Sequence, residues 1–260
     1  MSDLHLEFGT GYNSFHIRPG APYLCLLGDI GLAIHEEKLL RFLERQLESF
    51  KIVFFLLGNH EAYSSSYPFA KSLFTSFRQQ CEEKRKVDKS LGEFVFLDQT
   101  RYDVDDNVTI LGCTLYSNVI PEQYQDVRLS LNDFYEIKDW SVEKHNAAHE
   151  SDVKWLREQL AQLHDKEPER RVMILTHHSP TLVPEANDPR HRNSPLTSAF
   201  CTDLVPGGQL NLQQVKVWAY GHTHFNSDVK IEGTRLYSNQ RGYISSGFSP
   251  DFDAENLVEM

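Results

Sequence analysis

Imidazole, carboxylate and amide side chains recur where short apolar runs of this 260-residue chain end. The candidate metal ligands are Asp3, His5, Asp29, Asn59, His177, His222 and His224. Their nitrogen and oxygen atoms, with no thiolate among them, suit borderline metals such as Mn, Fe, Zn and Co. A carboxylate such as Asp29 can bridge two ions about 3.5–4 Å apart, the separation that two-metal hydrolases use. The residue types therefore predict a site for two divalent or trivalent metal ions.

Short β-rich runs must position these ligands. The four runs span residues 23–27, 52–57, 172–175 and 215–220. Each run ends in candidate ligands, and the ligands of open α/β sheets gather outside the carboxyl ends of strands. Because residues two apart on an extended segment share one side, each spaced pair of ligands should point two side chains into one site. The two spaced pairs are Asp3 with His5, and His222 with His224.

Helical patterns alternate with these runs. Helix-period segments span residues 35–50, 68–86 and 141–163, and further strands are expected at residues 94–97 and 108–116. Such alternation is typical of an α/β fold in which helices cover both faces of a sheet. A chain of this length sits near the upper end of what one α/β domain usually holds, so we interpret residues 1–260 as one domain.

The charge balance narrows the class of partner. The chain has 26 Lys and Arg residues against 37 Asp and Glu residues, a formal net charge of −11. That charge opposes electrostatic binding to nucleic acid or to an anionic membrane. A phosphate substrate stays compatible with it, because bound metal ions would be the largest local positive charges. We therefore expect a small-molecule partner, and the oligomeric state stays open.

The cysteines and the start of the chain bear on its compartment. The four cysteines show no CxxC spacing and are interpreted as reduced thiols of a cytoplasmic protein. No apolar run approaches the roughly 20 residues that span a bilayer. Only Met1 and Ser2 precede the first candidate ligand. The sequence thus leaves two alternatives, a very short first strand or a natural chain that begins further upstream.

Five sequence blocks occur in an order that resembles a known family. The blocks are "SDLH", "GDIG", "GNHE", "THHSP" and "GHTH", and they are similar to the signature of the calcineurin-like metallophosphoesterases. A sixth block, "GTRLYSNQRGY" at residues 233–243, resembles the strand and turn of a microbial and fungal subgroup in which "NPRGY" is commoner. The resemblance covers nearly the whole chain. It implies a four-layer α/β/β/α sandwich with mixed sheets and a metal site at the strand ends.

The same resemblance implies a role for each matching residue. One metal would be held by Asp3, His5, Asp29 and His224, and the second by Asp29, Asn59, His177 and His222. His60 would act beside the metals as a general acid or transition-state stabiliser. The residues from position 31 read "GLAI" where Ser/Thr protein phosphatases continue "VDRG". The arginine with which those phosphatases clamp phosphate is therefore missing, which argues against that class.

Other polar residues keep two interpretations each. Arg241 could reach a phosphate oxygen or be a solvated surface residue. His178 could contact substrate or orient a ligand, although we favour His177 as the ligand of that block. Glu61 could orient a ligand or accept from a backbone N–H. Substrate specificity is expected to reside in residues 117–139 and 180–209, since long irregular stretches in compact domains are usually functional.

Two classes of function are consistent with this pattern. The first is hydrolysis of a phosphate ester, in which a hydroxide held between the metals attacks phosphorus in line. Among substrates, a small-molecule phosphodiester is slightly favoured over a phosphomonoester. The alternative is a catalytically idle scaffold that keeps the fold for protein interaction. Such relatives typically lose metal ligands or the histidine of "GNHE", whereas every matching position is filled here.

Overall fold

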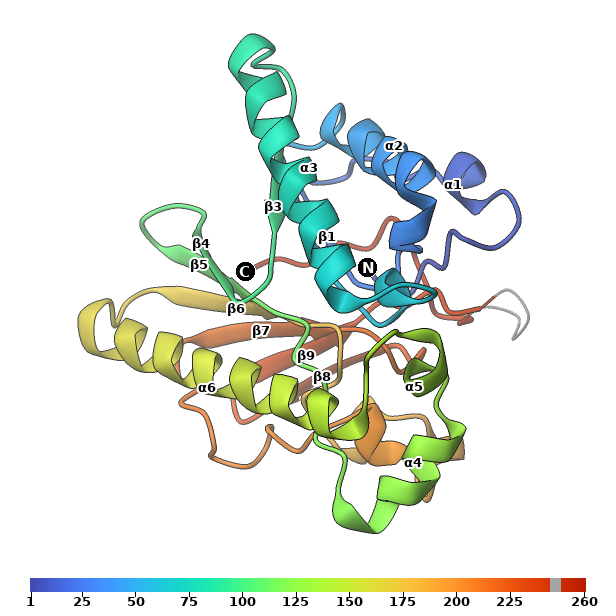
Figure 1. Ribbon diagram of the computed structural model, residues 1–260. Coiled ribbons are helices and arrows are strands. Elements are labelled where there is room, and N and C mark those ends of the chain that lie inside the picture. The colour runs from blue at the N-terminus through green and yellow to red at the C-terminus, as the bar shows by residue number, and fades with distance from the viewer. Residues whose placement is uncertain (244–248) are drawn as a thin grey trace.

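Two sheets form the centre of the computed structural model, which describes residues 1–243 and 249–260 (Figure 1). The three-stranded sheet is parallel and has the order β1-β2-β3. Its strands are β1 (Tyr23–Leu27), β2 (Ile52–Leu56) and β3 (Glu93–Phe96). The six-stranded sheet has the order β4-β5-β6-β7-β9-β8, with antiparallel pairing at both edges and parallel pairing between them. Its strands are β4 (Thr100–Asp103), β5 (Val108–Gly112), β6 (Arg171–Leu175), β7 (Val215–Tyr220), β8 (Ser227–Ile231) and β9 (Thr234–Ser238).

Helices cover the outer faces of the two sheets, as Figure 1 shows. The three-stranded sheet packs against α2 (Glu36–Leu47) and α3 (Tyr67–Val87), and the six-stranded sheet packs against α6 (Val142–Lys166). Side chains of both sheets, among them Phe54 and Met173, form one buried cluster between them. Helix, sheet, sheet and helix thus make four layers, which confirms the predicted α/β/β/α sandwich.

The helices begin where the sequence favours a start. Ser66 accepts a hydrogen bond from the backbone N–H of Phe69 at the start of α3, and proline occupies the first turn. Ser141 caps α6 in the same way, through the N–H of Lys144. Three shorter α-helices also lie within residues 1–243. They are α1 (Gly11–Ser14), α4 (Tyr124–Ser130) and α5 (Asp133–Glu136).

The first residues of the chain are held between the two sheets. The N–H groups of Asp3 and His5 donate to Gly28 and Asp29, which follow β1. On the other side, Ser2 pairs with Gln240 in a parallel bridge just after β9. The expected short first strand is therefore a single bridge, and backbone pairing on both sides fixes this segment. Among the described residues, no helix is long and apolar enough to cross a membrane.

Candidate metal centre

The seven predicted ligands meet at the carboxyl ends of β1, β2, β6 and β7 and on the N-terminal segment. Five of them have a positive φ between 46° and 70°, and these are Asp3, His5, Asp29, His222 and His224. The alternation expected of an extended segment is thus wrong for the two spaced pairs. Their side chains converge because the backbone takes the sparsely populated left-handed conformation. Such residues cost about 1–3 kcal/mol each and cluster at functional sites.

One group of ligand atoms surrounds His224. Its Nε2 lies 3.2 Å from Asp3 Oδ1 and 3.1 Å from His5 Nε2. Asp3 also accepts from the backbone N–H of His222, which fixes the carboxylate against the opposite segment. Asp29 Oδ2 lies 4.0 Å from His5 Nε2. These four side chains correspond to the predicted set for the first metal.

A second group surrounds His177. Its Nε2 lies 3.1 Å from His222 Nδ1, 3.2 Å from Asn59 Oδ1 and 3.5 Å from Asp29 Oδ1. The other ring nitrogen, Nδ1, donates to the carbonyl of Leu27 at 2.8 Å, so Nε2 is left without a proton to face the group. The two oxygens of Asp29 therefore face the two different groups, as a bridging carboxylate requires.

Glycine is required where the strand ends approach each other. A Cβ on Gly58 would lie 2.2 Å from Asp29 Oδ1, and a Cβ on Gly28 would lie 2.5 Å from the backbone nitrogen of Gly58. Gly28 also has a φ of +82°, which L side chains rarely adopt. The absence of side chains at these two positions lets β1 and β2 bring their ligands into one site.

Glu61 ties the same strand ends together. Its buried carboxylate accepts from the N–H groups of Gly58 at 2.7 Å, Ile30 at 2.8 Å and Asp29 at 3.0 Å. Of its two interpretations, acceptance from backbone N–H groups is therefore the one that the structure supports. Burial raises the pKa of Glu61 to about 7 in spite of these hydrogen bonds.

Three imidazoles of the centre, those of His5, His177 and His222, are held neutral by burial. Burial lowers the pKa of both His5 and His177 to about 4, and it lowers that of His222 well below its usual range. Burial also raises the pKa of Asp29 well above normal, and the charges of Glu61 and Asp3 add to that effect. Metals bind the neutral imidazole and the ionised carboxylate. These three histidines can therefore bind a metal without first losing a proton. The raised pKa values of Asp29 and Glu61 instead favour the protonated form of that carboxyl pair.

We predict that metal uptake at pH 6 releases protons from the Asp29–Glu61 carboxyl pair, whose pKa values are raised. The sign follows from the shifts: a raised carboxyl pKa means that the metal must displace a proton, and affinity falls as pH falls. His5 and His177, with a pKa of about 4, compete only below about pH 5. Titration calorimetry with Mn²⁺ in buffers of different ionisation enthalpy counts the protons. Uptake without any proton release would contradict the raised pKa values of this pair.

His60 lies beside both groups. Its Nδ1 donates to Glu7 Oε1 at 2.8 Å, and its Nε2 faces the hydroxyl of Tyr243 at 2.8 Å and Asp29 Oδ2 at 4.0 Å. Glu7 also accepts from His5 at 3.3 Å. Burial alone would raise the pKa of Glu7, but the hydrogen bonds from His5 and His60 outweigh it and lower this pKa to about 2. The Glu7 side chain is therefore an ionised carboxylate at physiological pH, and it orients His60.

Sequence reasoning missed Glu7 and Tyr243. Glu7 follows His5 by two residues, the same spacing that separates His5 from Asp3. This repeated spacing could have identified Glu7 from the sequence. Tyr243 ends the "NQRGY" block, and its ring lies 4.2 Å from that of His5 and 4.7 Å from that of His224. Only the fold brings Tyr243 over the N-terminal segment, because 236 residues separate it from Glu7.

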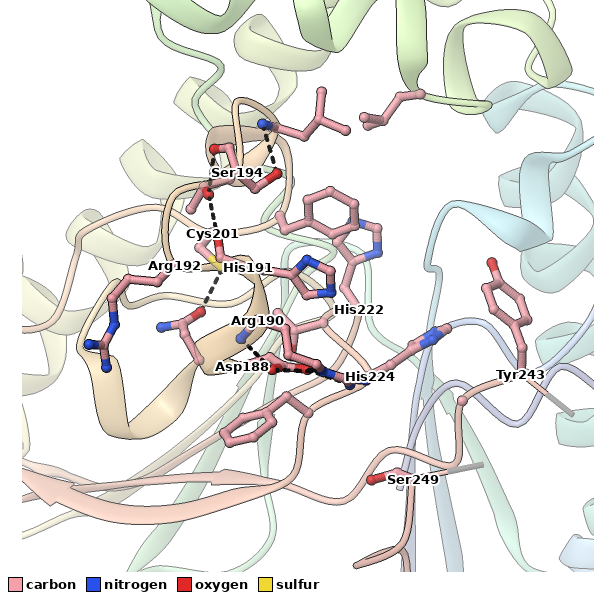
Figure 2. A pocket seen from close by; sticks show the side chains of 18 of the residues that line it. Asp188, Arg190, His191, Arg192, Ser194, Cys201, His222, His224, Tyr243 and Ser249 are labelled. Carbon is pink, nitrogen blue, oxygen red and sulfur yellow. Dashed lines mark hydrogen bonds and ion pairs between the residues drawn. The ribbon is translucent and has the colours of Figure 1, made fainter. Parts of the chain in front are cut away.

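A large pocket opens onto the centre. Its volume is about 1190 Å³, and its walls include Asp29, Asn59 and His222. Both irregular stretches singled out in the sequence contribute to it, residues 123–133 from the first and 182–201 from the second. Figure 2 shows His222 and His224 at this pocket, with Tyr243 on one side and the loop that carries His191 on the other.

The two substrate-contacting candidates lie outside the pocket lining. Arg241 donates to the carbonyl of Leu4 at 3.2 Å, and its guanidinium lies over the ring of Phe15 at 4.7 Å. His178 is fully buried behind the centre, with its ring 4.1 Å from that of His222. Neither position favours direct contact with a phosphate, and their substrate roles stay predictions.

Comparisons with known proteins identify a family and agree with the fold. The model of the calcineurin-like phosphoesterase family matches residues 1–226. Uncharacterized protein L509 of Acanthamoeba polyphaga mimivirus is 28% identical over 263 residues, which cover 94% of this chain and 90% of the viral protein. The crystal structure of phosphopantetheinyl hydrolase (PptH) from Mycobacterium tuberculosis gives a TM-score of 0.63 at 16% identity, covering 94% of this chain and 88% of that chain. At that identity the likeness shows the shared fold.

Proposed function

The chain belongs to the calcineurin-like phosphoesterase family, and from this premise we propose that it hydrolyses phosphate esters with two metal ions. One observation carries the proposal: two groups of ligand atoms meet at Asp29 and open onto a pocket of about 1190 Å³. His60 stands at the same place, held by Glu7.

The residues fit two metal ions. Ligand atoms of each group lie 3.1–4.0 Å apart, and atoms that share one ion at about 2.0–2.2 Å must approach each other in this way. Asp3, His5, Asp29 and His224 would hold the first ion, and Asp29, Asn59, His177 and His222 the second. When bound, the ions would polarise the phosphoryl oxygens and make the attacking water a stronger nucleophile. With nitrogen and oxygen donors only, Mn, Fe, Zn and Co all suit the site.

The protein's own groups handle the departing oxygen. Glu7 accepts a hydrogen bond from Nδ1 of His60. The other ring nitrogen, Nε2, therefore points to the mouth of the centre, where it contacts the Tyr243 hydroxyl. A proton on Nε2 can pass to the leaving alkoxide or phenoxide, and the Glu7 carboxylate stabilises the imidazolium that carries it. The side chain of Glu7 is 5% exposed, which shields this ion pair from water.

The pocket favours a substrate larger than a phosphate ion. Its walls reach from Asn59 to the exposed loop around Arg190, so a diester could place its second organic group there. We therefore propose a small-molecule phosphodiester ahead of a monoester. We also propose a reducing compartment such as the cytoplasm, since all four cysteines are unpaired. An interpretation as an idle scaffold is less favoured, because both ligand groups and His60 are in place.

We predict that the Mn²⁺-loaded protein cleaves bis-aryl phosphate faster than mono-aryl phosphate. A second organic group gains contacts in the pocket, whereas the extra charge of a monoester gains none from the acidic wall residues Asp133 and Asp188. Side-by-side steady-state assays with metal analysis of the same sample measure the preference. Faster cleavage of the monoester would reverse the substrate order, and two bound ions with no turnover on either would favour the scaffold.

A further inference from the structure

The amide of Asn59 has a fixed orientation. Its Oδ1 lies 3.2 Å from His177 Nε2, on the side of the second ligand group. Its Nδ2 donates to Asp133 Oδ1 at 2.9 Å and to the hydroxyl of Tyr63 at 3.0 Å. An amide presents its oxygen to a metal only when its nitrogen is turned away. These two acceptors therefore decide which end of the Asn59 amide faces the metal site.

Burying the Asp133 carboxylate beside Asn59 costs free energy. It is 3% exposed, and among the described residues it forms no ion pair with Lys or Arg. Hydrogen bonds from the Asn59 amide and the Tyr63 hydroxyl offset this cost, and the hydroxyl donates to Oδ1 at 2.6 Å. Tyr63 in turn stacks on His60, with ring centroids 4.3 Å apart and an interplanar angle of 24°. The Asp133 carboxylate thus contacts the candidate ligand Asn59 directly. It is linked to His60 through the Tyr63 ring.

Backbone pairing fixes the position of Asp133. It begins the short helix α5, whose last residue, Glu136, accepts from the N–H of Ser64 at 2.9 Å. Immediately afterwards Ile137 forms a parallel bridge with Ser65. The carboxylate is therefore held against the segment that carries Asn59 and His60. Both Asp133 and Tyr63 also line the pocket, beside Asn59 of the second ligand group.

We propose that Asp133 is a positioning residue, which turns the oxygen of Asn59 toward the second metal ion and holds Tyr63 against His60. This inference rests on the proposed function, because it needs the ion that Asn59 would bind. Groups that orient metal ligands typically contribute a factor of about 10–100 to metal affinity. The first ion has no ligand in contact with Asp133, so its affinity should not depend on this carboxylate.

The test measures Mn²⁺ binding to Asp133→Asn in the full chain by calorimetry and equilibrium dialysis. The asparagine keeps the shape of the side chain, but its NH₂ competes with that of Asn59 and lets the Asn59 amide turn over. We expect one of the two ions, the one that Asn59 would bind, to lose about 10- to 100-fold in affinity and the other ion to stay unchanged. Asp126→Asn is the matched control, since Asp126 is an exposed residue of the nearby helix α4.

A purely structural role gives a different result. In that case both ions would weaken together, or the melting temperature of the metal-free protein would fall with no selective change in binding, and either outcome overturns the inference. Wild-type affinity for both ions in Asp133→Asn overturns it as well, as does a wild-type protein that binds fewer than two ions. If the wild type binds two ions and cleaves no phosphate ester, the proposed function fails while selective loss in Asp133→Asn still supports the inference.

Discussion

Replacing His60 with asparagine is expected to lower kcat for aryl phosphate hydrolysis by about 10²- to 10⁴-fold, the usual contribution of a general acid. The reason is its position: Nδ1 is bound to Glu7, and Nε2 lies at the mouth of the centre. Metal content should stay nearly intact, because the two predicted ligand sets are complete without this ring. Steady-state kinetics and metal analysis on one preparation measure both quantities.

The metal content is the decisive part of this experiment. His60 Nε2 lies 4.0 Å from Asp29 Oδ2, and His5, Asp29 and His60 together could also hold an ion. Loss of one ion from the asparagine variant would make His60 a ligand and the assigned role wrong. His35→Asn is a suitable control, because that half-buried histidine contacts Tyr12 away from the metal centre. A substrate with a better leaving group should rescue the His60 variant, since it needs less proton transfer.

The sequence was sufficient for the strands that end in ligands and for the capped helices. The strand predicted at residues 215–220 matches β7, and the helix predicted from residue 141 is α6, which begins after its cap Ser141. It was insufficient for β4 and β8, which are short edge strands whose residues are only partly buried or exposed. Each of them pairs with one neighbouring strand only. Their exposed polar residues resemble those of a loop in sequence.

The seven candidate ligands were identified because each follows a buried strand or lies in a short block with a matching family pattern. Their geometry could not be foreseen in the same way. Positive φ values at Asp3 and His5 depend on pairing with residues near positions 28 and 240, far along the chain. The contact between Asn59 and Asp133 spans 74 residues and has no local signal. Residues that hold ligands by long-range contacts are therefore the part that sequence reasoning misses.

The bridging role of Asp29 makes the second large prediction. Asp29→Asn is expected to weaken both ions and to lower kcat/KM by about 10³-fold or more, since two-metal catalysis depends on both. An amide offers one neutral oxygen, whereas the carboxylate directs one oxygen toward His5 and the other toward His177. Calorimetry with Mn²⁺ and metal analysis would show the loss of both ions.

Asp3→Asn is the matched comparison, because the Asp3 carboxylate contacts the His224 imidazole of the first group, whereas its contact with His222 of the second group is to the backbone N–H alone. It should weaken one ion and leave the other bound by Asn59 and its partners. The two variants remove the same charge from the same buried centre, so a general effect of charge would make them alike. A double loss in Asp29→Asn beside a single loss in Asp3→Asn can arise only if Asp29 belongs to both sets. Two tightly bound ions and near-normal turnover in Asp29→Asn would exclude the bridge, and each group would then have to hold its ion independently.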